Sequence, residues 1–315
     1  MIYISIPVHE KPEVIADQMH NFKKYFPEAR VILHLSKCAE FSISELEFYL
    51  NSQGVDNAKV NPIQFQTKWG SIIQAHLENI RYIITLGDAE KIIFHSSNDM
   101  FVKKGIVEYI KDKKYLFQTR KCTADSLWWV ARRSVKDENI WKYFQGSIYA
   151  SQIEGSMYSM ELLKSLIDEI DYQRLNLGAE IFYPQEEVIF SSFAYKKGIK
   201  ADGFPYVYSE IHQFDRIFFY YIQKYKILFN SNLIITKFFK RVLEKFLKKY
   251  SNYRISVDII NDIIFDRPAL SNTCYLNDGN SLTWKIYEVR CLFSVKRVER
   301  ELSNLIREFI RRLRV

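Results

Sequence analysis

The sequence predicts an α/β fold with a mostly parallel central sheet and helices on both of its faces. Three observations support this prediction. Short β-rich apolar runs alternate with helical patterns through the first half, which favours parallel strands joined by right-handed crossovers. At 315 residues the chain is long enough to bury a large core. It contains only 10 glycines and 7 prolines, so loops do not dominate it.

The first half supplies most of the predicted sheet. Residues 2–8 form a β-rich run at the start of the chain. Ser42 and Glu45 have the spacing of a capping box, which predicts a helix ending near Leu50. Pro62 weakens the strand around it and favours a sheet edge. The other elements expected here are helices at 11–26, 70–86 and 104–112 and strands at 31–35, 59–65, 91–95 and 115–117.

The second half changes character near residue 216. Before it, the patterns predict helices at 159–170 and 186–197 and a short strand at 204–208. After it, the chain is aromatic and basic. We therefore expect a catalytic-type α/β domain at 1–215 and a basic, mostly helical C-terminal extension at 216–315.

The tail of this extension, residues 295–315, shows apolar residues at helical spacing. The opposite face is basic and includes Lys296, Arg297 and Arg300. Such a helix can lie on an anionic membrane or dock on its own domain, and the sequence leaves both alternatives open.

Composition limits the class of protein. The net charge of +8 suits a nucleotide, a polyanion or an anionic membrane surface, although it also serves solubility. The four cysteines are scattered and form no CxxC pair, which disfavours a structural zinc site and favours free thiols in a reducing compartment. The chain opens on a strand pattern and has no long apolar span, so we expect a cytoplasmic protein, peripheral to the inner face of a membrane.

The most informative segments are Thr67-Lys68-Trp69-Gly70 and the run from Lys91 to Met100, which lie on either side of a predicted helix. Their order is loop, helix, apolar strand and polar tip. In an open α/β sheet, ligands bind beyond the carboxyl ends of the strands. Asn98 and Asp99 at this tip can hold a sugar hydroxyl or a metal-bound phosphate, whereas their ordinary role would be a turn or a helix cap.

Over residues 2–200 the chain resembles the core-2/I-branching N-acetylglucosaminyltransferase and peptide xylosyltransferase family. Four segments carry the resemblance: the opening strand ending in Pro7-Val8-His9, the run Ile32–Lys37, Lys68-Trp69-Gly70 followed by Ala75, and Ser96–Met100. The resemblance implies a GT-A-like fold and an inverting glycosyltransferase that uses a nucleotide-sugar donor, UDP-linked in our expectation. It also implies donor or acceptor contacts from His9, Trp69, Gly70, Asn98 and Asp99.

Two later segments extend the resemblance. Gly155-Ser156 followed by a helix is similar to the family's acceptor segment, so both residues are expected to bind substrate. The run Pro184–Ser192 is similar to the segment that contains the family's catalytic base. Alignment on its apolar-aromatic residues assigns the base to Glu187, which we favour, and alignment on the proline assigns it to Glu186. Without the resemblance, both would be ordinary acids in the first turn of a helix.

Some positions depart from the family pattern. Ser36 replaces an acid that would help to position the donor nucleotide, and the secretory disulfides have no counterpart, which points to a bacterial cytoplasmic relative. Ser97-Asn98-Asp99 lacks the first acid of an Asp-x-Asp metal motif, so no cofactor is certain and a divalent metal is not required. The resembled enzymes neutralise the diphosphate with basic residues instead. The candidates for that role here are Arg216, Lys237, Arg241, Arg254 and Arg267, each of which could equally be a solvated surface charge.

Several residues have a plain structural alternative. His9 could make only a local hydrogen bond, Trp69 could simply pack, and Gly70 could serve close backbone approach. Trp128-Trp129 could stack on an acceptor sugar or fill the core.

The function predicted from the sequence is transfer of a sugar, N-acetylglucosamine being one candidate, to a glycan or glycolipid acceptor in bacterial surface polysaccharide or lipopolysaccharide synthesis. The rivals are a nucleic-acid or polyanion-binding protein and an inactive transferase-like assembly partner. No nucleic-acid module is recognisable, so we expect no nucleic-acid partner.

Overall fold

A computed structural model gives the fold. It describes residues 1–67, 70–124, 126, 128–170, 175, 183–209, 255–267, 273–277, 282–286 and 291–314, and the single residues 234, 238, 241, 242 and 245.

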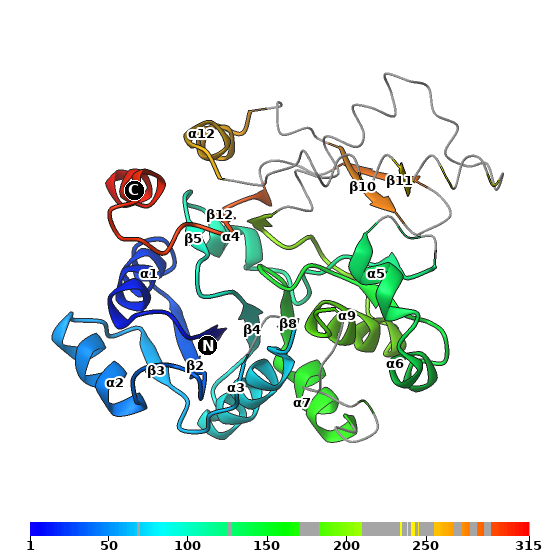
Figure 1. Ribbon diagram of the computed structural model, residues 1–315, viewed down its shortest axis with the longest axis horizontal. Coiled ribbons are helices and arrows are strands. Elements are labelled where there is room, and N and C mark those ends of the chain that lie inside the picture. Colours follow the sequence, from blue (N-terminus) through cyan, green and yellow to red (C-terminus); the bar gives the residue numbers. More distant parts are fainter. Residues whose placement is uncertain are drawn as a thin grey trace.

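A five-stranded sheet with the order β3-β2-β1-β4-β8 forms the centre of the protein (Figure 1). β1, β2, β3 and β4 are parallel, and β8 pairs antiparallel with β4. The predicted α/β class with a mostly parallel sheet is therefore confirmed. The strands are β1 (Ile2–Val8), β2 (Ala29–Leu35), β3 (Ala58–Val60), β4 (Lys91–Phe94) and β8 (Met157–Ser159).

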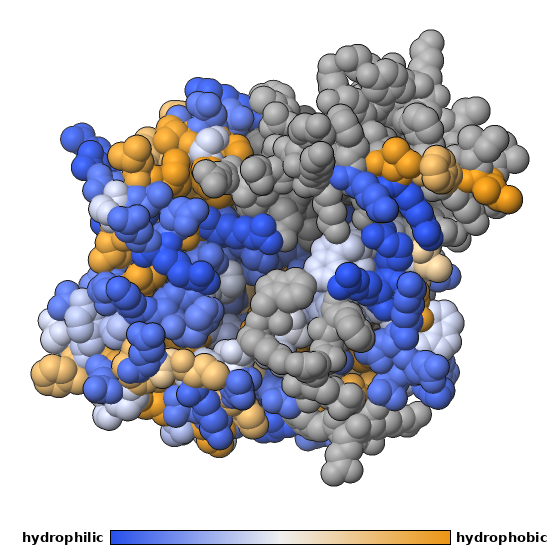
Figure 2. All heavy atoms as spheres, in the orientation of Figure 1, coloured by the Kyte–Doolittle hydropathy of each residue, from blue (hydrophilic) through white to orange (hydrophobic). Residues whose placement is uncertain are grey.

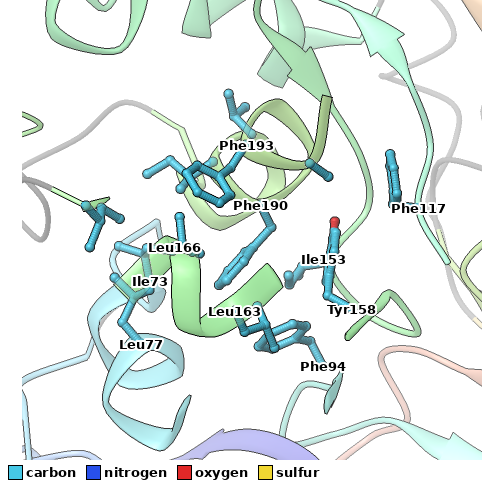
Figure 3. Close-up of a cluster of buried hydrophobic side chains, with 14 of the residues drawn as sticks. Ile73, Leu77, Phe94, Phe117, Ile153, Tyr158, Leu163, Leu166, Phe190 and Phe193 are labelled. Atoms are coloured by element: carbon cyan, nitrogen blue, oxygen red, sulfur yellow. The ribbon is translucent and has the colours of Figure 1, made fainter. Parts of the chain in front are cut away.

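Helices cover both faces of this sheet because alternate residues of each strand point to opposite sides. On one face, Ile4 and Ile6 of β1 are buried in a cluster with residues of α1 and α2. On the other face, Tyr3 and Ile32 are buried in a cluster with residues of α3, α7 and α9. Figure 3 shows the second cluster, in which Phe190 and Phe193 of α9 face residues of α3, α7 and β4. These helices are α1 (Pro12–Tyr25), α2 (Ile43–Ser52), α3 (Ile73–Leu86), α7 (Met160–Glu169) and α9 (Glu186–Lys196).

Local sequence signals explain several boundaries. Ser42 and Glu45 form the complete capping box at the start of α2. Gly87, with a φ of 79°, ends α3 in the left-handed conformation. The strand expected at 59–65 is shorter than predicted: β3 ends at Val60, two residues before Pro62, which cannot donate to the ladder. The expected strand at 115–117 is reduced to isolated bridges from Leu116 to Met157 and Gly203.

The segment 291–314 packs on the N-terminal half. β12 (Ser294–Val295) lies between β5 (Met100–Phe101) and β9 (Val207–Tyr208), antiparallel to the first and parallel to the second. The helix expected from residue 295 is wrong in its start: α13 runs only over Leu305–Arg312 and begins at its N-cap, Asn304. Pairing with two strands holds residues 294–295 extended, so tertiary hydrogen bonds outweigh the helical spacing.

α13 docks on its own domain. Arg307, whose side chain is completely buried, and Arg311 both form ion pairs with Asp17 of α1. Ile310 is buried in a cluster with residues of β12 and of α12 (Val257–Ile264). Within the described residues, the alternative of a helix docked on its own domain is therefore the observed one.

The remaining elements are short. β6 and β7 pair antiparallel, as do β10 and β11. Most of residues 210–254 lie outside the described part, and the domain boundary expected at residue 215 falls among them. The further bounds are α4 (Ile106–Ile110), β6 (Arg120–Lys121), α5 (Trp129–Ser134), α6 (Glu138–Tyr143), β7 (Tyr149–Ala150), β10 (Thr273–Asn277) and β11 (Leu282–Ile286).

Among the described residues, no helix is both long and apolar enough to cross a bilayer. Most of the described surface in Figure 2 is hydrophilic, and apolar residues gather near α12. Phe265, just after α12, is 63% exposed there.

Candidate active site

A cavity of about 680 Å³ opens at the carboxyl ends of β1 and β4. Pro7 and His9 line it from the end of β1, and Ser96, Ser97 and Asn98 line it from the loop after β4. This is where an α/β sheet binds its ligands, because the loops beyond the strand ends meet there.

The structure brings some of the predicted site residues to this cavity. His9, Gly70 and Asn98, all expected to bind substrate, line the cavity. Gly70 has a φ of 80°, a conformation that other residues rarely adopt. Trp69 lies outside the described residues.

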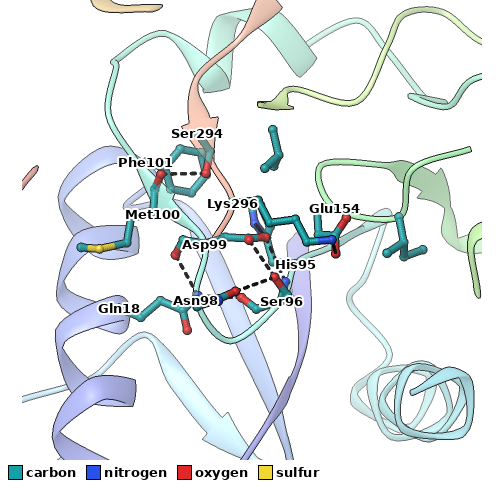
Figure 4. Close-up of polar contacts among 12 residues, drawn as sticks. Gln18, His95, Ser96, Asn98, Asp99, Met100, Phe101, Glu154, Ser294 and Lys296 are labelled. Atoms are coloured by element: carbon teal, nitrogen blue, oxygen red, sulfur yellow. Dashed lines mark hydrogen bonds and ion pairs between the residues drawn. The ribbon is translucent and has the colours of Figure 1, made fainter. Parts of the chain in front are cut away.

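Asp99 lies beneath the cavity and does not line it. Its Oδ1 accepts from the Ser96 hydroxyl at 2.7 Å, and its Oδ2 accepts from the Ser96 amide at 3.0 Å (Figure 4). Oδ2 is also 3.0 Å from Nδ1 of His95, whose Nε2 is 2.6 Å from the hydroxyl of Tyr206. The carboxylate is fully buried and engaged on both oxygens. In this arrangement the carboxylate orders the loop that carries Asn98.

Gly155 and Ser156 lie in a buried turn next to the cavity residues Ile153 and Glu154. Gly155 has a φ of 78°, and a Cβ at this position would lie 2.7 Å from the backbone nitrogen of Tyr206. The buried Ser156 hydroxyl donates to the carbonyl of Ile153 at 2.6 Å. Neither residue lines the cavity, but their neighbour Glu154 does.

Three carboxylates line the cavity: Glu154, Glu186 and Glu187. Glu186, in the first turn of α9, is 3% exposed, and its Oε2 has no hydrogen-bond partner among the described residues. Burial, together with the charge of Glu154, raises the pKa of Glu186 to about 8, although a backbone hydrogen bond at Glu186 and the charge of Lys296 oppose the rise. A cavity-facing carboxyl group with such a pKa can exchange a proton near neutral pH.

Four cations line the same cavity. Lys296 forms an ion pair with Glu154 at 2.6 Å, as Figure 4 shows, and Arg300 forms one with Glu10 at 2.6 Å. Arg297 lies between them in sequence, and Arg133 comes from α5. Three of the four therefore lie in the short segment that follows β12.

The basic residues chosen from the sequence are not these four. Arg267 lies 3.8 Å from Asp262 and over the ring of Phe265, and neither it nor Arg241 lines the cavity. Arg216, Lys237 and Arg254 lie outside the described residues. A signal was present in the sequence: the apolar run 291–295 reads as a strand, and basic residues directly after a strand lie at its end.

Trp128 and Trp129 form an aromatic part of the cavity wall. The guanidinium of Arg120 lies 5.6 Å from the Trp128 ring, and that of Arg133 lies 5.1 Å from the Trp129 ring. Both tryptophans are only partly buried. An indole held in this way offers a flat face on which a sugar ring can stack.

The described residues show no metal-binding cluster. They contain no group of three or more His, Cys, Asp and Glu side chains that could hold one. Asp99, the acid nearest to a metal motif, has both oxygens engaged within its own loop. We therefore derive no step through a metal ion.

Comparison with known proteins gives no family assignment. No protein-family model and no curated protein matches the chain. The predicted core-2/I-branching family therefore remains a prediction.

Three solved structures that match are glycosyltransferases. TarS from S. aureus aligns at 14% identity and a TM-score of 0.38, over 82% of this chain and 46% of that one, so this chain spans less than half of TarS. The mannosyltransferase PcManGT from Pyrobaculum calidifontis, solved with GDP-Man and Mn²⁺, aligns at 10% identity and a TM-score of 0.37, over 80% and 70%. An active-site mutant of LgtC aligns at 8% identity and a TM-score of 0.44, over 99% and 94%. At TM-scores below 0.5, these likenesses carry no argument about the function of this chain.

Proposed function

We propose that the protein is a glycosyltransferase that moves a sugar from a nucleotide-sugar donor to an acceptor hydroxyl, with inversion. One observation carries the proposal: a buried carboxyl group and a group of cations face the same cavity at the carboxyl ends of β1 and β4. Direct displacement at an anomeric carbon needs both, a base for the incoming hydroxyl and positive charge for the departing diphosphate.

The proposed reaction is a single displacement. The acceptor oxygen forms a bond to the anomeric carbon while its proton passes to the carboxylate. The bond from that carbon to the phosphate oxygen breaks, and its electron pair leaves with the nucleoside diphosphate. Lys296, Arg297 and Arg300 stabilise the leaving group, because they line the cavity beside the loop after β4.

We propose Glu186 as the base. Its Oε2 lacks a hydrogen-bond partner among the described residues, and its raised pKa makes the ionised form a strong proton acceptor. Glu187, which the sequence resemblance favoured, lines the same cavity and is the alternative base. Aligning the chain on Pro184 already pointed to Glu186.

Replacement of each glutamate separates the two assignments. Glu186→Gln should lower kcat at least a hundredfold, since general-base catalysis contributes about 10²–10⁴. Donor affinity should remain within a few fold. Transfer is measured with a panel of nucleotide sugars and glycan acceptors, and donor affinity by calorimetry.

Glu187→Gln is the matched control, because it changes the neighbouring carboxylate in the same turn of α9. Full activity in Glu186→Gln with loss in Glu187→Gln would reverse the assignment. If no nucleotide sugar binds to the unmodified protein, the proposed function itself fails.

We propose a UDP-linked donor, with N-acetylglucosamine as the first sugar to test, and a glycan or glycolipid acceptor on the side of Trp128 and Trp129. We place the enzyme at the inner face of a bacterial membrane because of its net charge of +8. A thermal-shift screen of nucleotide sugars, with and without manganese, identifies the donor by the rise in Tm that binding produces.

A further inference from the structure

Glu10 is a buried carboxylate directly behind the cavity. It lies two residues after the end of β1, and its side chain is 1% exposed although it does not line the cavity itself. Its Oε2 accepts from the backbone amide of His9 at 3.1 Å, and its Oε1 lies 3.5 Å from Nε2 of His9. It also bonds the side chain of Ser97 and accepts from Nε of Arg300 at 2.6 Å.

The three partners of Glu10 all line the cavity, and they come from three different parts of the chain. His9 directly follows β1, Ser97 belongs to the loop after β4, and Arg300 belongs to the segment after β12. The amide of Val298 donates to the carbonyl of Asn98 at 3.1 Å, so the same two loops are also joined through their backbones.

The groups around Glu10 stabilise its ionised form. Burial alone would raise its pKa, but the hydrogen bond from Ser97 and the charges of His9 and Arg300 more than offset this and hold the pKa below its usual value. The group is therefore ionised at neutral pH, and it pairs with Arg300 as a carboxylate.

Arg300 is oriented by this contact. Its Nε is committed to Glu10, while its side chain remains 54% exposed at the cavity. A guanidinium is planar, so fixing Nε fixes the plane in which the other N–H groups lie. Such a fork can bond two phosphate oxygens at once when it is correctly turned.

We propose that Glu10 is a positioning residue that turns Arg300 toward the diphosphate of the donor. The inference rests on the proposed function, because it requires a nucleoside diphosphate in the cavity. Glu10 does not touch the substrate. It acts by holding Arg300 in the binding orientation before the donor arrives, so that less conformational freedom is lost on binding.

The test compares UDP with UMP, because only the diphosphate offers the second phosphate. Calorimetry should show that Glu10→Gln weakens UDP binding roughly tenfold and UMP binding less than twofold, as expected for a hydrogen bond to a charged group. Glu10→Asp, which keeps the charge but withdraws the carboxylate by one methylene, should lose part of the preference for UDP over UMP.

A double-mutant cycle shows whether Glu10 acts through Arg300. In an Arg300→Gln background, Glu10→Gln should leave UDP affinity unchanged. Glu78→Gln is the matched control: Glu78 is another buried glutamate paired with an arginine, Arg81, but it does not line the cavity, and its replacement should leave the ratio of UDP to UMP affinity unchanged.

Each outcome has a defined meaning. Equal losses of UDP and UMP affinity, or an undiminished loss in the Arg300→Gln background, would overturn the positioning role while leaving the proposed function intact. Should Glu10→Gln not fold, the same comparison is made with Glu10→Asp. Failure of the unmodified protein to bind UDP, UMP and every nucleotide sugar of the panel would overturn the proposed function, and this inference with it.

Discussion

At the scale of single residues, three buried carboxyl groups in and around the cavity differ in how they are paired. Glu186, Glu10 and Asp99 are each at most 5% exposed, yet their hydrogen-bond partners differ. Glu10 and Asp99 are held by several donors, whereas Oε2 of Glu186 has none among the described residues. A buried carboxyl group without a partner costs stability and is kept where chemistry needs it.

The pKa of Glu186 predicts a pH dependence of stability. Its folded pKa of about 8 lies above the ordinary value of 4.5, so between these pH values the unfolded chain releases a proton that the folded protein retains. The contribution of this group to the free energy of unfolding therefore falls as pH rises from 4.5 to 8. The free energy of unfolding of the unmodified protein should therefore fall between pH 5 and pH 8 by about 3 kcal/mol more than that of Glu186→Gln.

Urea denaturation at the two pH values measures this difference. Glu187→Gln serves as the control for loss of a carboxylate in the same turn. Parallel stability curves for Glu186→Gln and the unmodified protein would show that Glu186 titrates normally.

The same raised pKa should appear in the pH profile of kcat/KM, which should increase with pH up to about 8 as the base ionises.

At the scale of elements, the contact between α1 and α13 holds the basic segment in place. Asp17 pairs with Arg307 and Arg311, and Nε of Arg307 donates to the carbonyl of Glu299 at 2.8 Å. Glu299 lies directly before Arg300, so this helix contact reaches the cavity through the backbone.

Asp17→Asn should therefore lower both stability and donor affinity. It leaves the fully buried Arg307 with an uncompensated charge, which costs about 3–5 kcal/mol. Chemical denaturation measures the first effect and UDP calorimetry the second. Asp56→Asn is the control. Asp56 forms an ion pair with Lys23 of α1 at 2.6 Å, but both side chains are exposed, so the expected cost is about 0–1 kcal/mol. Equal costs for the two variants would contradict this account of α13.

At the scale of the whole molecule, the two ends of the described chain build one site. β12 joins β5 to β9, and the residues after it line the cavity beside the end of β1. Deletion of residues 291–315 should abolish nucleotide binding and lower Tm, because it removes the central strand of the β5-β12-β9 sheet together with three cavity cations. Deletion of residues 314–315, which follow the end of α13, should change neither property. Thermal unfolding with and without UDP checks both, and UDP binding by the longer deletion would show that these cations are dispensable.

Local sequence was sufficient to predict the parts of this protein that depend on neighbours in the chain. The alternation of strands and helices, the capping box at Ser42 and Glu45, and the stop at Gly87 follow from local periodicity and backbone chemistry. The alternation also predicted a ligand edge beyond the strand ends, and His9 and Asn98, expected there to bind substrate, line the cavity.

Which charges meet at that edge depends on contacts that form only in the folded molecule. Helical spacing in residues 295–315 describes one helix, but pairing with β5 and β9 makes residues 294–295 a strand and turns Lys296, Arg297 and Arg300 into the cavity. Likewise, the sequence could not separate Asp99, which orders its own loop, from Glu154, which faces the cavity. Periodicity shows which residues of a segment share a face, whereas burial, ion pairing and strand pairing depend on residues as far apart as Asp17 and Arg311, which are separated by 294 positions.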